Sequence, residues 1–305
     1  MRIGIKTTDT YDSLTLDGRI DFVRSLAEAG FASVYPVSHS DWDTLTDLAL
    51  VGRMIVGVRL GTSIIQTFPR HPLILASQAL SVQAATGNRL TLGIGPGAEP
   101  LIEGTFGLPY DAPARHSREF LSVLMPLLRG EPVSHDGESF RVEGSVSMPG
   151  ADAPTVLLSA LGPVMLRIAG EMADGTITTW TGPRSLESHI VPTITAAAEA
   201  AGRPRPRVVA EAVICVTDDS GATRTYIDEQ FGFFTQLPSY RAMLEREGAE
   251  RVSQVAIIGD AEEVQRQIQR YASAGVSELV AVPFGPEADR DRTIEVLAAL
   301  ARSAQ

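Results

Sequence analysis

Three closely spaced glycines end an apolar run in Gly93-Ile-Gly-Pro-Gly97 and form the first candidate site. Because glycine has no side chain and tolerates positive φ, Gly95, Pro96 and Gly97 either let a ligand approach the backbone or form a tight turn. Glu99 follows this loop and is the carboxylate best placed for acid/base chemistry, with a solvated loop glutamate as the alternative. The loop therefore predicts a ligand site with one candidate catalytic acid or base.

A second candidate site is Ser159-Ala160-Leu161-Gly162-Pro163, which joins a short apolar run to a helical pattern. Proline is typical of the first helical position, and the amide groups at a helix start have no partner within the helix. Such amides bind anions, so the segment predicts a phosphate site that needs no lysine. An ordinary helix start is the alternative.

Polar side chains follow two other apolar runs. His39 has an acid and the indole of Trp42 nearby in the sequence, so it is either an acid/base residue or a structural histidine. Thr62, Ser63 and Ile64 end another run. They form either a half-buried strand end or a bulge that supports one face of a planar cofactor.

The remaining histidines and the cysteine show no catalytic spacing. His116, His135 and His189 are expected on the surface, and His71 is expected to cap a helix. The absence of HxH and HExxH spacings predicts no metal site. Cys215, inside an apolar run, is expected to be a buried core residue rather than a catalytic thiol.

The elements that position these residues alternate between strand and helix along the whole chain. The runs expected as strands are 2–6, 33–37, 58–65, 89–95, 155–159, 175–179, 208–217 and 278–283. Helical patterns cover 16–29, 42–52, 72–86, 113–129, 163–172, 186–201, 261–274, 293–301 and most of 222–248.

Eight strand–helix units predict an α/β fold, a single (β/α)8 barrel of the TIM type. An open doubly wound sheet is the alternative, but no glycine-rich phosphate loop follows the first strand. In a barrel the C-terminal strand ends form the active site, and the candidate residues above follow such ends.

One domain is expected over 1–305, with insertions at about 98–112, 131–150 and 222–258. Residues 135–146 have the pattern of a small hairpin. The segment 222–248 contains several aromatic residues and is interpreted as a lid, a dimer face or a plain helical core.

Charge and composition limit the kinds of partner that the protein is expected to bind. The net charge of −11 disfavours nucleic acid. The sequence has no run of about 18 apolar residues, so no membrane span is predicted. The start of the chain has no secretory pattern, so a cytoplasmic location is expected. Lys6 is the only lysine, so a bound anion must be held mainly by arginine, amide or hydroxyl groups.

Several motifs together resemble those of the luciferase-like monooxygenase superfamily. They are GTSI in the third strand, LGIGPG in the fourth, SALGPV at the fifth helix, ADGTITTW after it, and VAIIGDAEEV with AGVSELVAVPF near the end. The resemblance extends over nearly the whole chain and is strongest to the branch that uses the deazaflavin coenzyme F420.

This resemblance implies a barrel, usually in a homodimer, that binds the deazaflavin ring across its mouth. It implies a non-prolyl cis peptide at Ser63–Ile64 against one ring face and the cofactor phosphate on Leu161-Gly162-Pro163. His39 matches a position beside the ring, and Glu99 lies near an acidic position. Sugar-phosphate enzymes of this branch use lysines that this chain lacks, which argues against a phosphorylated sugar as substrate.

The resemblance leads to three hypotheses. The first is an F420-dependent oxidoreductase in which His39 or Glu99 exchanges a proton and the cofactor carries the hydride. Trp42, Thr179 and Trp180 then line a pocket for a small organic substrate. The alternative interpretation of the two tryptophans is that they are buried core residues. The second is an FMN-dependent monooxygenase, and the third is a flavin-binding protein without catalytic activity.

Overall fold

The computed structural model describes residues 1–7, 9–36 and 42–304. Its strands are β1 (Arg2–Lys6), β2 (Ser33–Tyr35), β3 (Arg59–Gly61), β4 (Ile65–Gln66), β5 (Leu90–Gly95), β6 (Val133–Asp136), β7 (Arg141–Gly144), β8 (Thr155–Ser159), β9 (Gly175–Thr178), β10 (Arg207–Val216), β11 (Ile257–Gly259) and β12 (Glu278–Pro283). Its α-helices are α1 (Asp9–Asp12), α2 (Leu16–Glu28), α3 (Thr44–Met54), α4 (Pro72–Thr86), α5 (Glu99–Phe106), α6 (Pro113–Leu128), α7 (Pro163–Met172), α8 (Pro183–Ser185), α9 (Val191–Ala200), α10 (Ser220–Phe231), α11 (Pro238–Glu247), α12 (Ala261–Ser273) and α13 (Glu287–Ser303). Shorter helical turns are η1 (Leu186–Ile190), η2 (Gly232–Gln236) and η3 (Val252–Gln254).

Parallel strands close into a barrel, which confirms the predicted TIM-type fold. The order around the barrel is β1-β2-β3-β5-β8-β9-β10-β12, and β12 pairs with β1. The pairing of β9 with β10 completes the ring. Because an open doubly wound sheet has two unpaired edges, this closure excludes the alternative.

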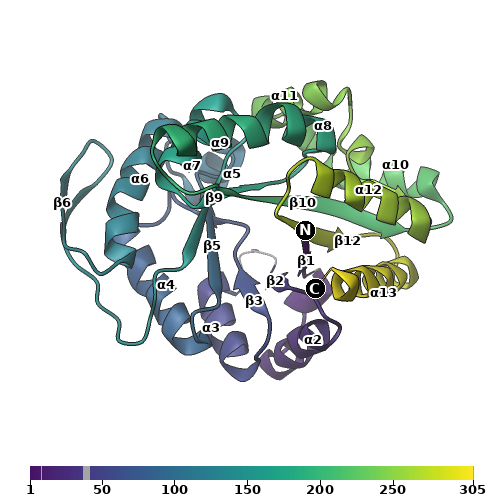
Figure 1. The fold of residues 1–305 in the computed structure, drawn as a ribbon, viewed down its shortest axis with the longest axis horizontal. Coiled ribbons are helices and arrows are strands. Elements are labelled where there is room, and N and C mark those ends of the chain that lie inside the picture. The colour runs from purple at the N-terminus through teal and green to yellow at the C-terminus, as the bar shows by residue number, and fades with distance from the viewer. Residues whose placement is uncertain (8, 37–41, 305) are drawn as a thin grey trace.

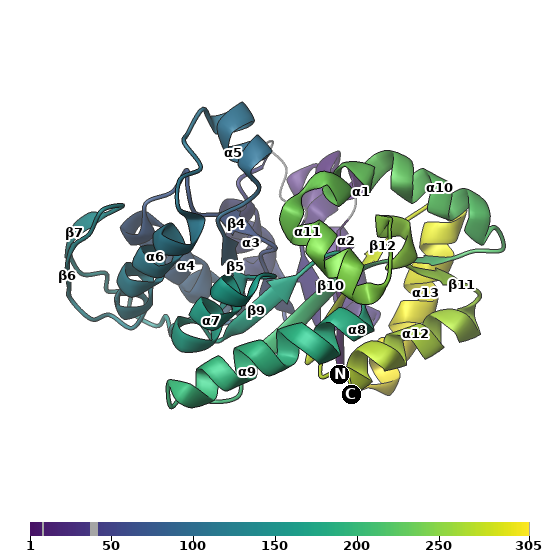
Figure 2. The same cartoon turned by 90° about the horizontal axis from the view of Figure 1, so that it is seen from above.

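Helices surround the strands (Figure 1). Both chain termini lie at one end of the barrel, and α5 lies at the other (Figure 2). Since β1 starts beside the N-terminus, the end with α5 carries the C-terminal ends of the strands. This end, called the mouth below, is where barrel enzymes place their active sites.

Side chains from several strands fill the middle of the barrel. One buried cluster contains Tyr35, Leu157, Ile177, Val209 and Val280, with Ile64 packed against it. Because side chains alternate along a strand, Ser159, Glu211 and Val282 face the interior one layer nearer the mouth. Together with Ile64 and Lys6, these residues are called the floor of the mouth below.

Three elements differ from the sequence-based expectation. The third strand is interrupted at 62–64, so β3 and β4 are separate, and Thr62 turns its hydroxyl to the carbonyl oxygen of Gly93 at 2.8 Å. Helix α5 was expected as a loop because only Ile102 is buried and the segment lacks apolar periodicity. Strand β11 has three residues, too few for a readable pattern.

The predicted hairpin is present as the antiparallel pair β6–β7, which projects beside α6 (Figure 1). The aromatic segment 222–248 forms α10, η2 and α11. Phe231 and Phe234 pack against Trp180 at ring-centroid distances of 5.2 and 5.8 Å. The segment is therefore a packed helical structure at one side of the mouth. In the described part of the chain, no helix is long and apolar enough to cross a membrane.

Candidate active site

The interruption between β3 and β4 lies at the mouth. The peptide bond between Ser63 and Ile64 is cis, as the sequence resemblance implies. The Thr62 amide donates to the carbonyl oxygen of Thr91 at 3.1 Å, so the bulge is fixed to β5 on one side. Thr62 itself is fully buried, whereas Ser63 and Ile64 are half-buried at the surface of the floor.

The glycine loop packs tightly against the floor next to this bulge. A Cβ added to Gly95 would lie 2.7 Å from Ile64 Cδ1 and 2.9 Å from Ser159 Cβ, so any larger residue forces these side chains to move. Pro96 is half-buried, and Gly97 has a φ of +81°, which favours glycine. The loop therefore contains the turn that the sequence left open, and its close contacts at Gly95 are with the side chains of Ile64 and Ser159.

The segment after β8 presents a helix start at the mouth. Gly162 occupies the N-cap of α7 with extended backbone, and Pro163 is the first helical residue. A Cβ added to Gly162 would meet no described atom within 4 Å, so space is open beside the first amides of α7. Ala160 and Leu161 are buried. The positive end of the helix dipole and its free amides would suit an anion at this position.

The two candidate catalytic residues are placed differently. His39 lies outside the described residues. Glu99 is exposed and begins α5 above the glycine loop. Tyr110 lies beside it and donates its hydroxyl hydrogen bond to the carbonyl oxygen of Gly97 at 2.9 Å. Burial, and secondarily the charge of Glu99, raise the pKa of Tyr110, which keeps that phenol protonated.

The three residues expected in a substrate pocket have different environments in the structure. Trp42 is 36% exposed, and its ring stacks on the buried guanidinium of Arg19 at 4.8 Å. Thr179 follows β9 and is half-buried. Trp180 is 6% exposed and belongs to the buried cluster under α10 and α11, the core position that the sequence left open as an alternative.

Two histidines expected on the surface are buried, which corrects the sequence-based expectation. His116 stacks on Phe68 with ring centroids 4.0 Å apart, and its Nε2 lies 3.0 Å from Thr67 Oγ1. His189 Nε2 lies 2.8 Å from the carbonyl oxygen of Leu161. Both histidines lie on the inward sides of their helical segments. Periodicity analysis follows apolar residues, so it did not reveal that these polar residues are buried. His189 thereby helps to fix the segment before α7.

Sequence reasoning missed the charged residues of the floor. Lys6 ends β1 and contacts Glu211 of β10, with Nζ 3.1 and 3.2 Å from the two carboxylate oxygens. Tyr240 of α11 lies close enough for the Glu211 charge to act on its hydroxyl. The sequence did contain one signal for this pair, a glutamate in the otherwise apolar run 208–217. A charged residue within a barrel strand indicates either a position at the mouth of the barrel or an ion pair.

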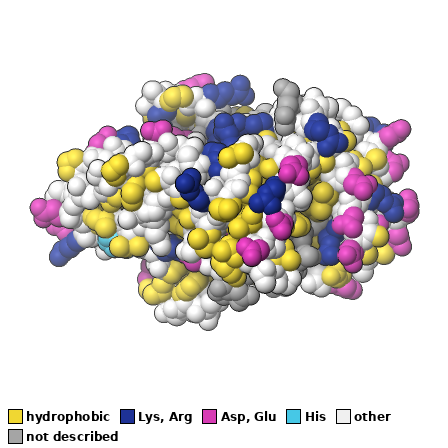
Figure 3. Space-filling view, turned by 90° about the horizontal axis from the view of Figure 1, so that it is seen from below, with side chains coloured by type: hydrophobic (Ala, Val, Ile, Leu, Met, Phe, Trp, Pro, Cys, Tyr) yellow, Lys and Arg dark blue, Asp and Glu magenta, His cyan; other side chains and the backbone are white. Residues whose placement is uncertain are grey.

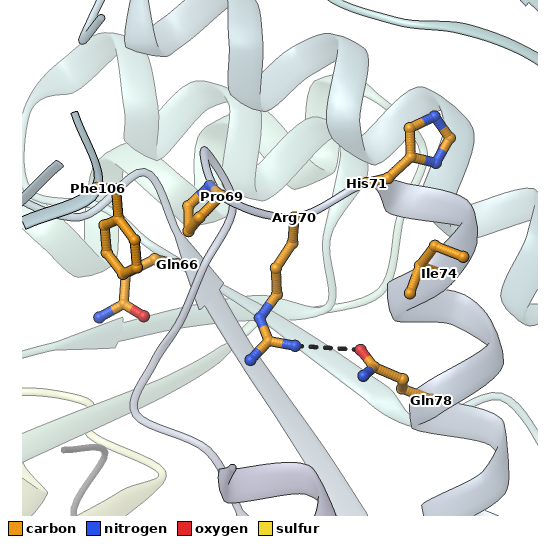
Figure 4. A pocket seen from close by; sticks show the side chains of 7 residues that line it. All are labelled: Gln66, Pro69, Arg70, His71, Ile74, Gln78 and Phe106. Atoms are coloured by element: carbon orange, nitrogen blue, oxygen red, sulfur yellow. Dashed lines mark hydrogen bonds between the residues drawn. The ribbon is translucent and has the colours of Figure 1, made fainter. Parts of the chain in front are cut away.

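A separate cavity of about 410 Å³ lies beside the mouth (Figure 4). It lies between the end of β4 and the start of α4, and Phe106 of α5 borders it. Arg70 reaches into it and donates to Gln78 Oε1 at 3.1 Å, while its other nitrogen pairs with Asp43 at 2.9 Å. The cation of this cavity is thus already neutralised within the chain.

Comparison with known proteins gives one matching family. The model of the family described as luciferase-like monooxygenase matches residues 1–278 of the 305 residues. The chain is also similar to the 5,10-methylenetetrahydromethanopterin reductase of Methanopyrus kandleri, at 26% identity over 90% of this chain and 91% of that protein. The enzyme of the same name from Methanolobus tindarius is 27% identical over 78% of this chain and 73% of that protein.

Solved structures share the fold. An F420-dependent secondary alcohol dehydrogenase has a TM-score of 0.81 at 17% identity, and covers 100% of this chain and 99% of its own. The EDTA monooxygenase of Chelativorans sp. BNC1 also has a TM-score of 0.81, at 15% identity over 100% and 94% of the two chains. At these identities the likeness establishes the barrel architecture.

Proposed function

Because this chain belongs to the luciferase-like monooxygenase family, we propose that it is an F420-dependent oxidoreductase acting on a small, non-phosphorylated organic substrate. Two relatives matched over most of their length are named as reductases of a pterin substrate, and a structural neighbour is named as F420-dependent. When bound, the deazaflavin supplies or accepts the hydride, and the protein binds, orients and shields it.

The observation that carries this proposal is the combination of the floor at Gly95 and the open start of α7. Because Gly95 has no side chain, Ile64 and Ser159 pack directly against the loop and form a surface on which a flat ring can lie, and the amides after Gly162 suit its phosphate. The residues present therefore fit the cofactor. In the proposal Thr62, Ser63 and Ile64 support one face, Gly95, Pro96 and Gly97 border the ring, and Ser159 to Pro163 hold the phosphate.

The proton that accompanies the hydride is assigned to His39 or Glu99. Glu99 is exposed at the mouth, so it can exchange protons with solvent. Trp42 and Thr179 are proposed to border the substrate. Lys6 is already paired with Glu211 and Arg70 with Asp43, which supports a substrate without a phosphate group.

The experiment is a titration of the purified protein with coenzyme F420 and with FMN, followed by fluorescence. We expect F420 to bind and FMN to compete weakly. The variant Gly162→Asp places a carboxylate at the N-cap, which stabilises helix starts but repels a phosphate. We therefore expect weaker F420 binding with an unchanged or higher melting temperature. A tight FMN complex without a response to F420 would contradict the proposal.

The FMN-dependent monooxygenase is the second candidate, and one observation favours it. A monooxygenase shares the fold as closely as the F420-dependent enzyme does, with the same TM-score. Both cofactors carry a phosphate that suits the start of α7. Oxygen uptake with reduced FMN would support this candidate.

We also propose that the protein forms a homodimer and works in the cytoplasm. Helix α3 exposes Leu50 and Met54 by 42% and 61%, Val56 just after it is 84% exposed, and Ile74 near the start of α4 is 54% exposed. Helix α4 contains no charged residue. Figure 3 shows hydrophobic side chains gathered across the middle of this side of the molecule. An apolar patch of this kind is typical of a protein–protein interface.

A further inference from the structure

A buried ion pair lies inside the barrel at the floor of the mouth. Strands β1 and β10 are not neighbours, because β12 lies between them, so Lys6 and Glu211 meet through the interior over this one strand. The two side chains are 17% and 7% exposed. Lys6 Nζ also donates to the carbonyl oxygen of Ser63 at 3.2 Å, which joins the pair to the bulge between β3 and β4.

Stability alone does not explain this pair. Taking two charges out of water costs about as much as their attraction returns, and well-packed apolar residues often stabilise a core more. The layer directly below is apolar apart from the Tyr35 hydroxyl, so the barrel interior accommodates such residues. The pair is therefore better explained by a ligand at the floor than by the fold.

The hydrogen-bond inventory shows which partner is left for a ligand. The three donors of the Lys6 ammonium match its three contacts, the two Glu211 oxygens and the Ser63 carbonyl. A carboxylate has about four acceptor positions, and Lys6 fills two of them. In the described residues, the hydrogen bonds that reach Glu211 come from Lys6. Glu211 thus keeps acceptor capacity at the floor.

The phenol beside the pair adds no charge to the floor. Burial, and then the charge of Glu211 and the neighbouring Tyr110, raise the pKa of Tyr240 to about 12. Tyr240 is therefore a neutral phenol at physiological pH, and the carboxylate of the floor is that of Glu211, which pairs with Lys6. An ionised carboxylate is the strongest neutral-pH acceptor for an N–H group.

The ring proposed for this floor carries the matching group. Flavins and deazaflavins share a pyrimidinedione edge, on which one imide N–H lies between two carbonyls. We propose that Glu211, oriented by Lys6, accepts a hydrogen bond from this imide N–H and so fixes how the ring enters the barrel. The inference rests on the proposed function and adds Glu211 as a binding residue and Lys6 as a positioning residue.

The test uses 8-hydroxy-5-deazaflavin and its N3-methyl derivative, in which a methyl group replaces the imide hydrogen. Fluorescence titration gives Kd for both compounds with wild type, Glu211→Gln and Glu211→Ala. We expect methylation to weaken binding to wild type by about tenfold to a hundredfold, the usual range for a hydrogen bond to a charged group. In Glu211→Ala the two compounds should bind with similar Kd. The exposed Glu138→Gln on the hairpin serves as the control.

A second variant separates binding from folding. Lys6→Met combined with Glu211→Leu removes both charges together, so we expect an equal or higher melting temperature but at least about tenfold weaker binding of the parent compound. Loss of stability with unchanged binding would assign the pair a purely structural role.

The outcomes are distinguishable. Equal Kd for the two compounds in wild type, or the same ratio in wild type and Glu211→Ala, would overturn the inference while the proposed function stands. No binding of either compound or of F420 to wild type would overturn both.

Discussion

Gly95 shows how one residue determines the shape of the floor. Its missing side chain lets Ile64 and Ser159 pack directly against the loop, and the ring is proposed to lie over these side chains. In Gly95→Ala the new Cβ displaces these two side chains, so we expect at least about tenfold weaker F420 binding and a loss of stability of about 1–3 kcal/mol from overpacking. Fluorescence titration and thermal unfolding measure the two effects.

Gly104→Ala is the matched control for that change, because a Cβ at Gly104 in α5 meets no described atom within 4 Å. It should leave F420 binding unchanged. Wild-type affinity in Gly95→Ala would show that the ring does not contact this part of the floor.

His116 gives a prediction about pH. Burial lowers its pKa to about 4 from the ordinary 6.5. Between these values the unfolded chain binds a proton that the folded protein does not, so the free energy of unfolding falls as the pH drops from 6.5 to 4. His116 contributes about 3 kcal/mol to that fall. Urea unfolding at several pH values measures it.

His116→Phe retains a ring that can stack on Phe68 and removes the titration. The variant should therefore lose less stability than wild type across this pH range, even if it starts lower at pH 7. If the free energy of unfolding has the same pH dependence in both proteins, His116 takes up a proton in the folded protein as readily as in the unfolded chain.

Residue chemistry was only partly predictable from the sequence. The cis bond at Ser63–Ile64 follows the resemblance, and the helix start at Pro163 follows from local rules. The Lys6–Glu211 pair could not be predicted, because its members lie 205 positions apart and meet only when the barrel closes. Local pattern carries no information about which strands face each other across a barrel.

At the scale of elements, Trp180 attaches the helical segment α10–α11 to the barrel. Its ring packs against Phe231 and Phe234. Trp180→Ala leaves a cavity there, so we expect a loss of about 3–5 kcal/mol in the free energy of unfolding. We also expect limited proteolysis within 220–247 before the rest of the chain is cut.

Phe233→Ala is the control for this prediction, since Phe233 is 50% exposed on η2. It should change stability by less than about 1 kcal/mol. If Trp180→Ala behaves like this control, the segment is held by contacts other than the indole.

Strong periodicity made most elements predictable. The bounds of α4, α7 and β8 agree with the sequence-based ranges. The missed α5 and the split third strand lie at the mouth, where local signals conflict with regular structure. Short or irregular segments near a binding site are therefore where the sequence pattern is least informative.

At the scale of the whole molecule, the two ends of the barrel have different roles. Opposite the mouth, buried Glu278 pairs with Arg207 at 2.8 Å and Arg2 at 3.4 Å and accepts a hydrogen bond from the Tyr35 hydroxyl. Glu278→Ala removes the partner of Arg207, Arg2 and the buried Tyr35 hydroxyl, so we expect a loss of about 1–3 kcal/mol in stability. The Kd for F420, measured where the variant is folded, should stay that of wild type. An equal loss of affinity would contradict the separation of roles.

The proposed homodimer is tested by making its face charged. Met54→Glu and Ile74→Glu place carboxylates in the apolar patch on α3 and α4, so we expect monomers in sedimentation velocity. Phe233→Glu, at an exposed site outside this patch, should leave the association state unchanged. A monomeric wild type would contradict the proposal directly.

The central claim is that the mouth formed by the bulge, the glycine loop and the start of α7 is a deazaflavin site. The most direct measurement is a crystal structure of the protein with coenzyme F420 bound. The account predicts the ring over Ile64 and the Gly95 loop and the phosphate on the amides after Gly162. A cofactor seated elsewhere, for example with its phosphate on Arg70 in the neighbouring cavity, would contradict it.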